Sequence, residues 1–242
     1  MGKEQAFIIG DIHGMDQALD DILKKWDKAS QQLVFVGDYI DRGHNSAATL
    51  QKVYALNQEE GAICLRGNHE QLLLDFLDHP MMNWNLYKRN GGTTTISNIL
   101  EIPELQINTF SAKRIAKEVM QTLPWLRDWL SHLPYYYTFG EFIVVHAGVD
   151  LSLTDWRQTK PFDFIWIREP FHYKDNHTGH TIIFGHTPTM MLHQNFNDFS
   201  IWQEDRKIGI DTGAVYGGRL TAIVIDAHTV LETYQIETHK EN

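Results

Sequence analysis

Hydrophobic residues in this chain concentrate in short runs that each stop at a polar residue. The clearest runs cover residues 6–9, 33–36, 62–65, 142–145 and 181–184. Runs of four or five mainly apolar residues, bounded by glycine and polar residues, are typical of buried β-strands. We therefore predict strands at these five places, each followed within three residues by a side chain that can bind a metal.

Helices are predicted between the first strands. Apolar residues recur at helical spacing after Asp16, after Asn45 and after Glu70. Strands that alternate with helices over the first 80 residues imply a sheet of parallel strands joined by helices. In such sheets ligands collect at the carboxyl ends of the strands, which is where the polar residues fall.

Residues 80–135 have a different pattern, which predicts a helical insert. The segment 84–92 has the composition of a loop, and a helix is expected to follow it as far as Leu100. Ser111 is a candidate N-cap for another helix that ends near Leu123. We expect the insert to wall one side of a functional site, although it could also pack only on the domain surface.

From residue 135 onward the pattern predicts mostly strands, in antiparallel or mixed pairing, around an irregular segment at 147–180. Nothing in the composition marks a linker, so a single domain over residues 1–242 is expected. The fold class is α/β. The strands predicted in this half are 135–139, 142–146, 181–185, 207–211, 219–225 and 230–236.

Composition and charge argue against several classes of function. The net charge is −10, which disfavours a broad nucleic-acid or membrane surface but not a phosphorylated substrate. No apolar stretch approaches the roughly 20 residues of a membrane span, and no secretory signal precedes the first strand. The single cysteine, Cys64, fits a reducing, cytoplasmic location. Histidines outside the strand ends, such as His172, are expected on the surface or in loops.

The polar residues after the runs form a set of metal ligands. Asp38 has two carboxylate oxygens and can bridge two ions, so the set can hold a pair of them. Its mixture of carboxylate, imidazole and amide groups suits Mn, Fe or Zn better than Ca or Mg. Each residue alone could equally be a helix cap, a turn residue or a buried histidine. The candidate ligands are Asp11, His13, Asp38, Asn68, His146 and His186.

These segments resemble the signature motifs of the calcineurin-like metallophosphoesterases, within the bacterial and phage-type phosphoprotein phosphatase branch. The resemblance runs in the correct order from residue 10 to about residue 218. It implies a metallophosphoesterase-type β-sandwich of mixed sheets flanked by helices, with the helical insert near residues 80–135. The segments that carry it are 10–14, 37–43, 67–70, 146–148 and 185–188.

The resemblance also implies a role for each site residue. His69 is expected to protonate the leaving oxygen, and Asp41 to orient His69. Arg42 and Arg168 are expected to bind phosphate oxygens, for which the planar guanidinium is well suited. Two divalent or trivalent ions are expected, with Mn favoured and Fe or Zn as alternatives. Asp11, His13 and Asp38 would hold the first ion, and Asp38, Asn68, His146 and His186 the second.

Two departures narrow the branch of the superfamily. Pro188 stands where many phosphodiesterases and nucleases of the superfamily carry a further histidine ligand, so the nuclease-like branch is disfavoured. The segments 90–93 and 210–218 are similar to those of bacterial and phage members, including symmetrical dinucleoside tetraphosphate hydrolases. A phosphorylated protein or a small phosphorylated compound is therefore the expected partner.

Three functions are compatible with these residues. The first is hydrolysis of phosphomonoesters by direct attack of a metal-bridging hydroxide, in the manner of a serine/threonine protein phosphatase. The second is symmetrical cleavage of a dinucleoside polyphosphate at the same site, which requires an adenine-stacking surface. The third, a regulator without turnover, is disfavoured because no ligand or acid is missing. Aromatic residues that could stack on adenine are Trp84, Tyr87, Trp166 and Tyr216.

Overall fold

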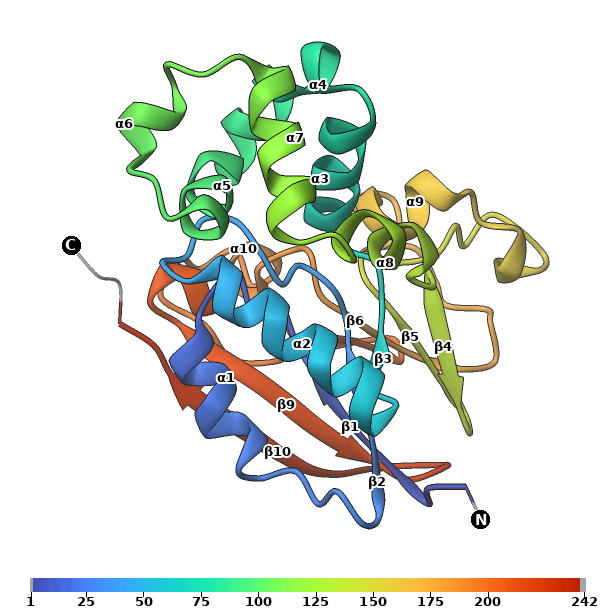
Figure 1. The fold of residues 1–242 in the computed structure, drawn as a ribbon. Helices are drawn as coiled ribbons and strands as arrows, with labels where there is room; N and C mark the ends of the chain where they lie inside the picture. The colour runs from blue at the N-terminus through green and yellow to red at the C-terminus, as the bar shows by residue number, and fades with distance from the viewer. Residues whose placement is uncertain (1, 240–242) are drawn as a thin grey trace.

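The first of two sheets combines strands from both ends of the chain in the computed structural model, which describes residues 2–239 (Figure 1). Strands β1 (Gln5–Ile9), β2 (Gln31–Phe35) and β3 (Ile63–Cys64) run parallel, as predicted. Strand β9 (Arg219–Ile225) lies antiparallel to β1, and β10 (Val230–Glu237) pairs with β9. The last two strands thus return to the sheet with which the chain begins.

The second sheet has the order β4-β5-β6-β8-β7 and mixed pairing. Strands β4 (Tyr136–Phe139) and β5 (Phe142–Val145) are antiparallel, whereas β5, β6 (Thr181–Phe184) and β8 (Lys207–Gly209) are parallel. The short edge strand β7 (Trp202–Glu204) was not predicted, because only its first residue is buried and no apolar run marks it. The predicted α/β sandwich of mixed sheets is confirmed.

Alternating side chains along each strand build the layers. Ile8 and Val34 of the first sheet pack with Val144 and Ile183 of the second in one apolar cluster between the sheets. Their neighbour Phe7 points to the opposite face and packs among the helices. Successive side chains point to opposite faces because a strand is pleated. Since the other sheet covers one face and helices cover the other, both faces of these strands are apolar.

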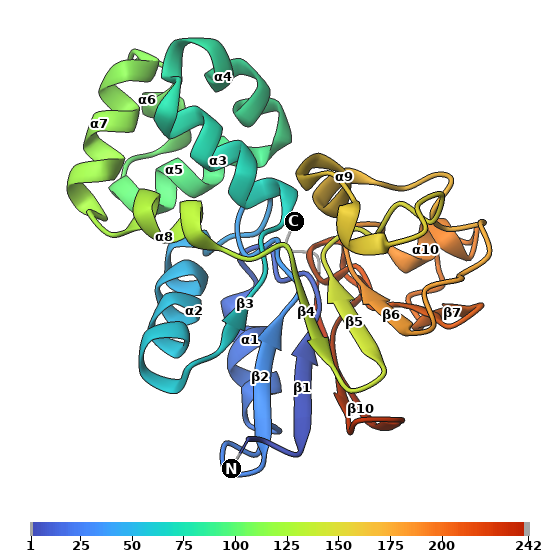
Figure 2. The same cartoon turned by 90° about the vertical axis from the view of Figure 1, so that its right-hand side faces the viewer.

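Helices cover the outer faces of both sheets (Figure 2). Helices α1 (Asp16–Leu23) and α2 (Ser46–Glu60) contact the first sheet, and their buried residues join its outer cluster. On the second sheet, α9 (Pro161–Trp166) and α10 (Thr189–Leu192) contribute to a separate apolar cluster.

The predicted helical insert is present and stands at one end of the sandwich (Figure 2). The expectation of a loop at 84–92 was wrong. Pro80 begins a helix that continues to Tyr87, and a kinked turn at Lys88–Gly92, in which Gly91 has a non-helical conformation, joins it to the next helix. Tyr87 is fully buried against Phe76, which stabilises this helix despite its weakly amphipathic sequence. The helices here are α3 (Asn68–Asp78), α4 (Pro80–Tyr87), α5 (Thr93–Leu100), α6 (Glu104–Ile107), α7 (Ala112–Thr122) and α8 (Leu126–His132).

Within residues 2–239, no helix has the length and apolar character needed to cross a membrane.

Candidate active site

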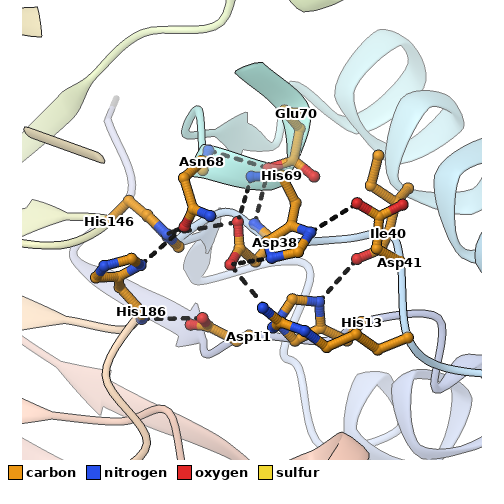
Figure 3. Close-up of polar contacts among 12 residues, drawn as sticks. Asp11, His13, Asp38, Ile40, Asp41, Asn68, His69, Glu70, His146 and His186 are labelled. Atoms are coloured by element: carbon orange, nitrogen blue, oxygen red, sulfur yellow. Dashed lines mark hydrogen bonds and ion pairs between the residues drawn. The ribbon is translucent and has the colours of Figure 1, made fainter. Parts of the chain in front are cut away.

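The predicted ligands lie together where strands of both sheets end (Figure 3). Those of the first sheet follow β1 and β2 or begin α3, and those of the second follow β5 and β6. Parallel strands bring their carboxyl ends to one edge, so residues up to 175 positions apart become neighbours. Asp11, His13, Asp38, Asn68, His146 and His186 are all at most 6% exposed.

Unusual backbone conformations aim several of these side chains inward. His13, Asp38 and His186 all have positive φ angles, between 46° and 65°. For residues with a Cβ, such conformations cost on the order of 1–3 kcal/mol each and persist only where surrounding contacts enforce them. At Gly185 a side chain would collide with the Asp11 carboxylate, because an added Cβ would lie 1.9 Å from Oδ1. The turns at the strand ends are therefore shaped around the site.

The first group of predicted ligands comprises Asp11, His13 and Asp38, of which His13 lies beside one carboxylate oxygen of Asp38. His13 donates from Nδ1 to the Ile40 carbonyl over 2.7 Å, which leaves a lone pair on Nε2. That Nε2 lies 3.5 Å from Asp38 Oδ2. Asp11 accepts a bond from the His186 backbone N–H through Oδ2, while its buried Oδ1 has no hydrogen-bond partner within residues 2–239.

The second group surrounds the other oxygen of Asp38. His146 faces the Val36 carbonyl through Nδ1 at 3.1 Å, so its Nε2 carries the lone pair. This Nε2 lies 3.4 Å from Asp38 Oδ1 and 3.0 Å from Asn68 Oδ1. Nδ1 of His186 lies 2.8 Å from the same Asn68 oxygen. His146 Nε2 and Asn68 Oδ1 are both electron-rich and lie 3.0 Å apart, an arrangement that a cation between them would stabilise.

Electrostatics also favour cations at this position. Burial, followed by the charges of Asp211 and Asp38, raises the pKa of Asp11 well above its usual value. Burial lowers the pKa of His13 and of His186, so both rings are neutral and able to bind a metal at neutral pH. Unpartnered acceptors, neutral imidazoles and crowded carboxylates fit a site for positive ions.

A buried histidine–aspartate pair adjoins the first ligand group. Nδ1 of His69 donates to Asp41 Oδ2 over 2.6 Å, and both side chains are fully buried. The opposite ring nitrogen, Nε2, has no hydrogen-bond partner in the described chain and lies 4.0 Å from Asp38 Oδ2. The pair can thus hold one tautomer of His69 and present Nε2 toward the ligand cluster.

The two predicted arginines reach the site from different sheets. Arg42 is exposed, and its Nη1 lies 2.6 Å from His13 Nε2. Arg168 is also exposed and donates from Nε to the Thr187 hydroxyl over 3.2 Å. Both guanidinium groups therefore lie between the buried ligands and solvent, where they can contact an anionic substrate.

Two buried acids of this region had no assigned role in the sequence. Glu70 accepts backbone N–H bonds from Asp38, Tyr39 and Gly67 over 2.8–3.0 Å and so holds the turn that carries Asp38. Asp211 is buried nearby, and its pKa is raised to about 6 by burial and by the Asp38 charge. A signal for Asp211 exists, because it follows an apolar run in the same manner as the predicted ligands.

The structure refines one expectation about a side chain and corrects another. His172 lies in a turn, within the expectation of a surface or loop position, but it is only 3% exposed because Phe171 and Phe184 pack against its ring. Tyr87 is fully buried and offers no face for stacking. Of the remaining aromatic candidates, Trp166 contacts one of the ligands, with its ring 5.8 Å from that of His186.

Comparison with known proteins agrees with this geometry. The family model of the calcineurin-like phosphoesterases matches residues 6–229. The chain is 30% identical to serine/threonine-protein phosphatase 1 of Salmonella typhimurium over 224 residues, which cover 89% of both proteins.

Another relative is named for a different activity. The chain is 28% identical to the symmetrical bis(5'-nucleosyl)-tetraphosphatase of Dechloromonas aromatica over 194 residues, or 72% of this chain and 60% of the relative.

Among solved structures, a serine/threonine phosphatase from Saccharomyces cerevisiae superimposes with a TM-score of 0.59 at 16% identity, covering 98% of this chain and 81% of the yeast chain. The structural match shows a shared fold.

Proposed function

This chain belongs to the calcineurin-like phosphoesterase family, and we propose that it hydrolyses phosphomonoesters in the manner of a serine/threonine protein phosphatase. The observation that carries the proposal is Asp38, whose two oxygens face two separate groups of ligands. The His69–Asp41 pair lies beside the shared carboxylate. A dinuclear site next to a proton donor has the groups to activate a water and to protonate the leaving oxygen in phosphoester hydrolysis.

The proposed ligand assignment adds Asp11, whose buried Oδ1 has no hydrogen-bond partner in the described chain, to the residues grouped around Asp38. We assign Asp11, His13 and Asp38 to one ion, and Asp38, Asn68, His146 and His186 to the other. When bound, two such ions supply Lewis acidity, which neutralises phosphate charge and lowers the pKa of the attacking water. Manganese is the proposed metal, with iron or zinc as alternatives that the same donor atoms accept.

Protein side chains are proposed to donate the proton and to bind the phosphate. His69 donates a proton from Nε2 to the leaving oxygen, while Asp41 fixes the ring and stabilises its charge. Arg42 and Arg168 bind the outer phosphate oxygens from opposite sides. Cys64 cannot compete as a nucleophile, because burial raises the pKa of its thiol. Water is therefore the proposed nucleophile, without a covalent enzyme intermediate.

A second candidate function is the symmetrical hydrolysis of dinucleoside polyphosphates. The observation that favours it is an aromatic stack beside the ligands. Phe162 is 66% exposed and stacks on Trp166 at 6.0 Å, and Trp166 in turn contacts His186. An exposed stack at this distance from the ligands could bind an adenine base.

A competition assay separates the two candidates. The manganese-supplemented protein is given a phosphoserine peptide and diadenosine tetraphosphate together, and the products are resolved by chromatography. Free phosphate with intact dinucleotide supports the phosphatase; release of two ADP supports the dinucleotide hydrolase. Phe162→Ala should then slow only dinucleotide cleavage, whereas Phe196→Ala, 73% exposed on a different segment, serves as the matched control.

Composition supports a proposal for the cellular location of the protein and for its partners. We place it in one domain over residues 1–242 in the cytoplasm, with a phosphorylated protein or small phosphorylated compound as partner. The net charge of −10 and the single cysteine support this placement, and neither a nucleic acid nor a membrane is proposed as a partner.

A further inference from the structure

The helical insert contributes two hydroxyl groups to the buried Asp41 carboxylate. Tyr87 donates to Asp41 Oδ1 over 2.9 Å, and Thr95 donates to the same oxygen over 2.5 Å. His69 occupies the other oxygen, Oδ2. All four side chains are fully buried. Asp41 is therefore saturated by three donors, two of which come from a segment about 50 positions further along the chain.

The backbone of Asp41 is held by the same segment. Its N–H donates to the Thr95 hydroxyl and to the Ser46 hydroxyl, each over 2.9 Å. Asp41 has a φ of 71°, a conformation that an aspartate adopts only when neighbouring contacts enforce it. Thr95 thus fixes both the backbone and the side chain of this residue.

The glycine pair in the Asn90–Thr93 segment permits this close approach. An added Cβ at Gly91, whose φ is 99°, would lie 2.9 Å from the backbone nitrogen of Arg42. An added Cβ at Gly92 would lie 2.6 Å from the Tyr87 ring. Glycine at position 91 therefore allows the insert to contact the turn at Asp41–Arg42, and glycine at position 92 leaves room for the Tyr87 ring. In this arrangement the hydroxyl groups of Tyr87 and Thr95 reach the Asp41 carboxylate.

We propose that Tyr87 and Thr95 are positioning residues of the proton-donating pair. They fix the Asp41 carboxylate so that Oδ2 stays bonded to His69 Nδ1 and Nε2 stays directed toward the leaving oxygen. The helical insert then contributes positioning residues to the active site. This inference rests on the proposed function, because it assumes that His69 is the proton donor.

The Asp41 carboxylate needs hydrogen-bond donors on both oxygens to keep its orientation. Removal of either hydroxyl, that of Thr95 or that of Tyr87, takes one of two donors from Oδ1. Water cannot replace that donor in a fully buried site. The carboxylate can then rotate and weaken its bond to His69. Loss of comparable outer partners at metal sites typically reduces activity by about 10–100-fold.

The test compares neighbouring threonines with the same substitution. Thr95→Val removes the hydroxyl that reaches Asp41, whereas Thr94→Val removes one that bonds Glu104 on the surface. With the manganese-loaded protein, Thr95→Val and Tyr87→Phe should lower kcat/KM on phenyl phosphate by about 10-fold or more. Both should change p-nitrophenyl phosphate much less, since nitrophenolate needs little protonation. Thr95→Ser should restore the activity, and Thr94→Val should match the wild type.

Proton NMR of the zinc-loaded protein, in which the metal is diamagnetic, gives a second readout that does not depend on turnover. The Nδ1 proton of His69, in a 2.6 Å bond to a carboxylate, should resonate far downfield and be absent from His69→Asn. It should shift or broaden in Thr95→Val and Tyr87→Phe only. An unchanged resonance and an unchanged ratio between the two substrates, in folded variants, would overturn the positioning role.

His69→Asn separates failure of this inference from failure of the proposed function. If that variant loses equal activity on both substrates, the acid role of His69 fails. If it loses activity selectively while Thr95→Val and Tyr87→Phe do not, the acid role stands and only the positioning role is refuted.

Discussion

Replacing His69 by asparagine tests the proton-donating role most sharply. General acid catalysis contributes about 10²–10⁴-fold, equivalent to about 2.7–5.4 kcal/mol of activation free energy. The structure favours a large effect, because His69 and Asp41 are fully buried and joined by a 2.6 Å bond. Loss of that bond to a carboxylate should also lower the free energy of unfolding by about 1.5–3 kcal/mol.

The assay uses two substrates that differ only in the leaving group. On phenyl phosphate, His69→Asn should lose about 10²–10⁴-fold in kcat/KM, and on p-nitrophenyl phosphate considerably less. The content of bound metal, measured by elemental analysis, should stay at the wild-type value, since Asp11, His13 and Asp38 remain.

A competing role for His69 makes this result informative. His69 Nε2 lies 4.0 Å from Asp38 Oδ2, and His13, Asp38 and His69 could together hold an ion. If His69 is a ligand rather than an acid, the asparagine variant should lose metal. Its activity should then fall equally on both substrates, and that result would refute the proton-donating role.

Three further substitutions have distinct expected outcomes. Asp38→Asn should reduce bound metal below two ions per chain by elemental analysis, because an amide bridges two cations poorly; unchanged content would exclude the bridge. Arg168→Lys should lower kcat/KM by about 10-fold, since a lysine cannot bind two phosphate oxygens in fork geometry, whereas the surface variant Arg157→Lys should have no effect. Burial, with the charges of Arg168 and Lys207, lowers the pKa of His172 to about 4, so the unfolded chain binds its proton first and stability falls as the pH drops from 6.5 toward 4. Urea unfolding should therefore show that the wild type loses about 1–2 kcal/mol more than His172→Phe between pH 7 and pH 5, and parallel losses would contradict this.

The sequence was sufficient to predict the strands that carry the candidate ligands, and the residues at the ends of those strands. The strands at 142–145 and 181–184 were found at these positions, because runs of four residues rich in β-branched and aromatic side chains are too short for a helix and suit a buried strand. His146 and His186 then follow from position alone, since parallel neighbouring strands end at the same edge.

The remaining features depend on contacts distant in sequence. The assignment of β9 and β10 to the first sheet is a property of topology, and their sequences would suit either sheet. Tyr87 lies in a segment that has the composition of a loop, and only its packing on Phe76 and its bond to Asp41 show its place. No local pattern distinguishes such a tyrosine from an exposed one.

His172 illustrates the same limit for polar residues. Its neighbours Phe171 and Tyr173 differ in exposure from fully buried to 58%, with no period that indicates which way each side chain points. In irregular segments of this kind, burial is decided by the surrounding helices and strands.

The most direct test of the dinuclear site is a crystal structure of the manganese-loaded protein with anomalous diffraction data. We predict two manganese peaks that share Asp38, one also bound by Asp11 and His13 and the other by Asn68, His146 and His186, with His69 outside both ligand shells. A single peak, or a peak bound by His69, would contradict the proposed dinuclear site and its proton donor.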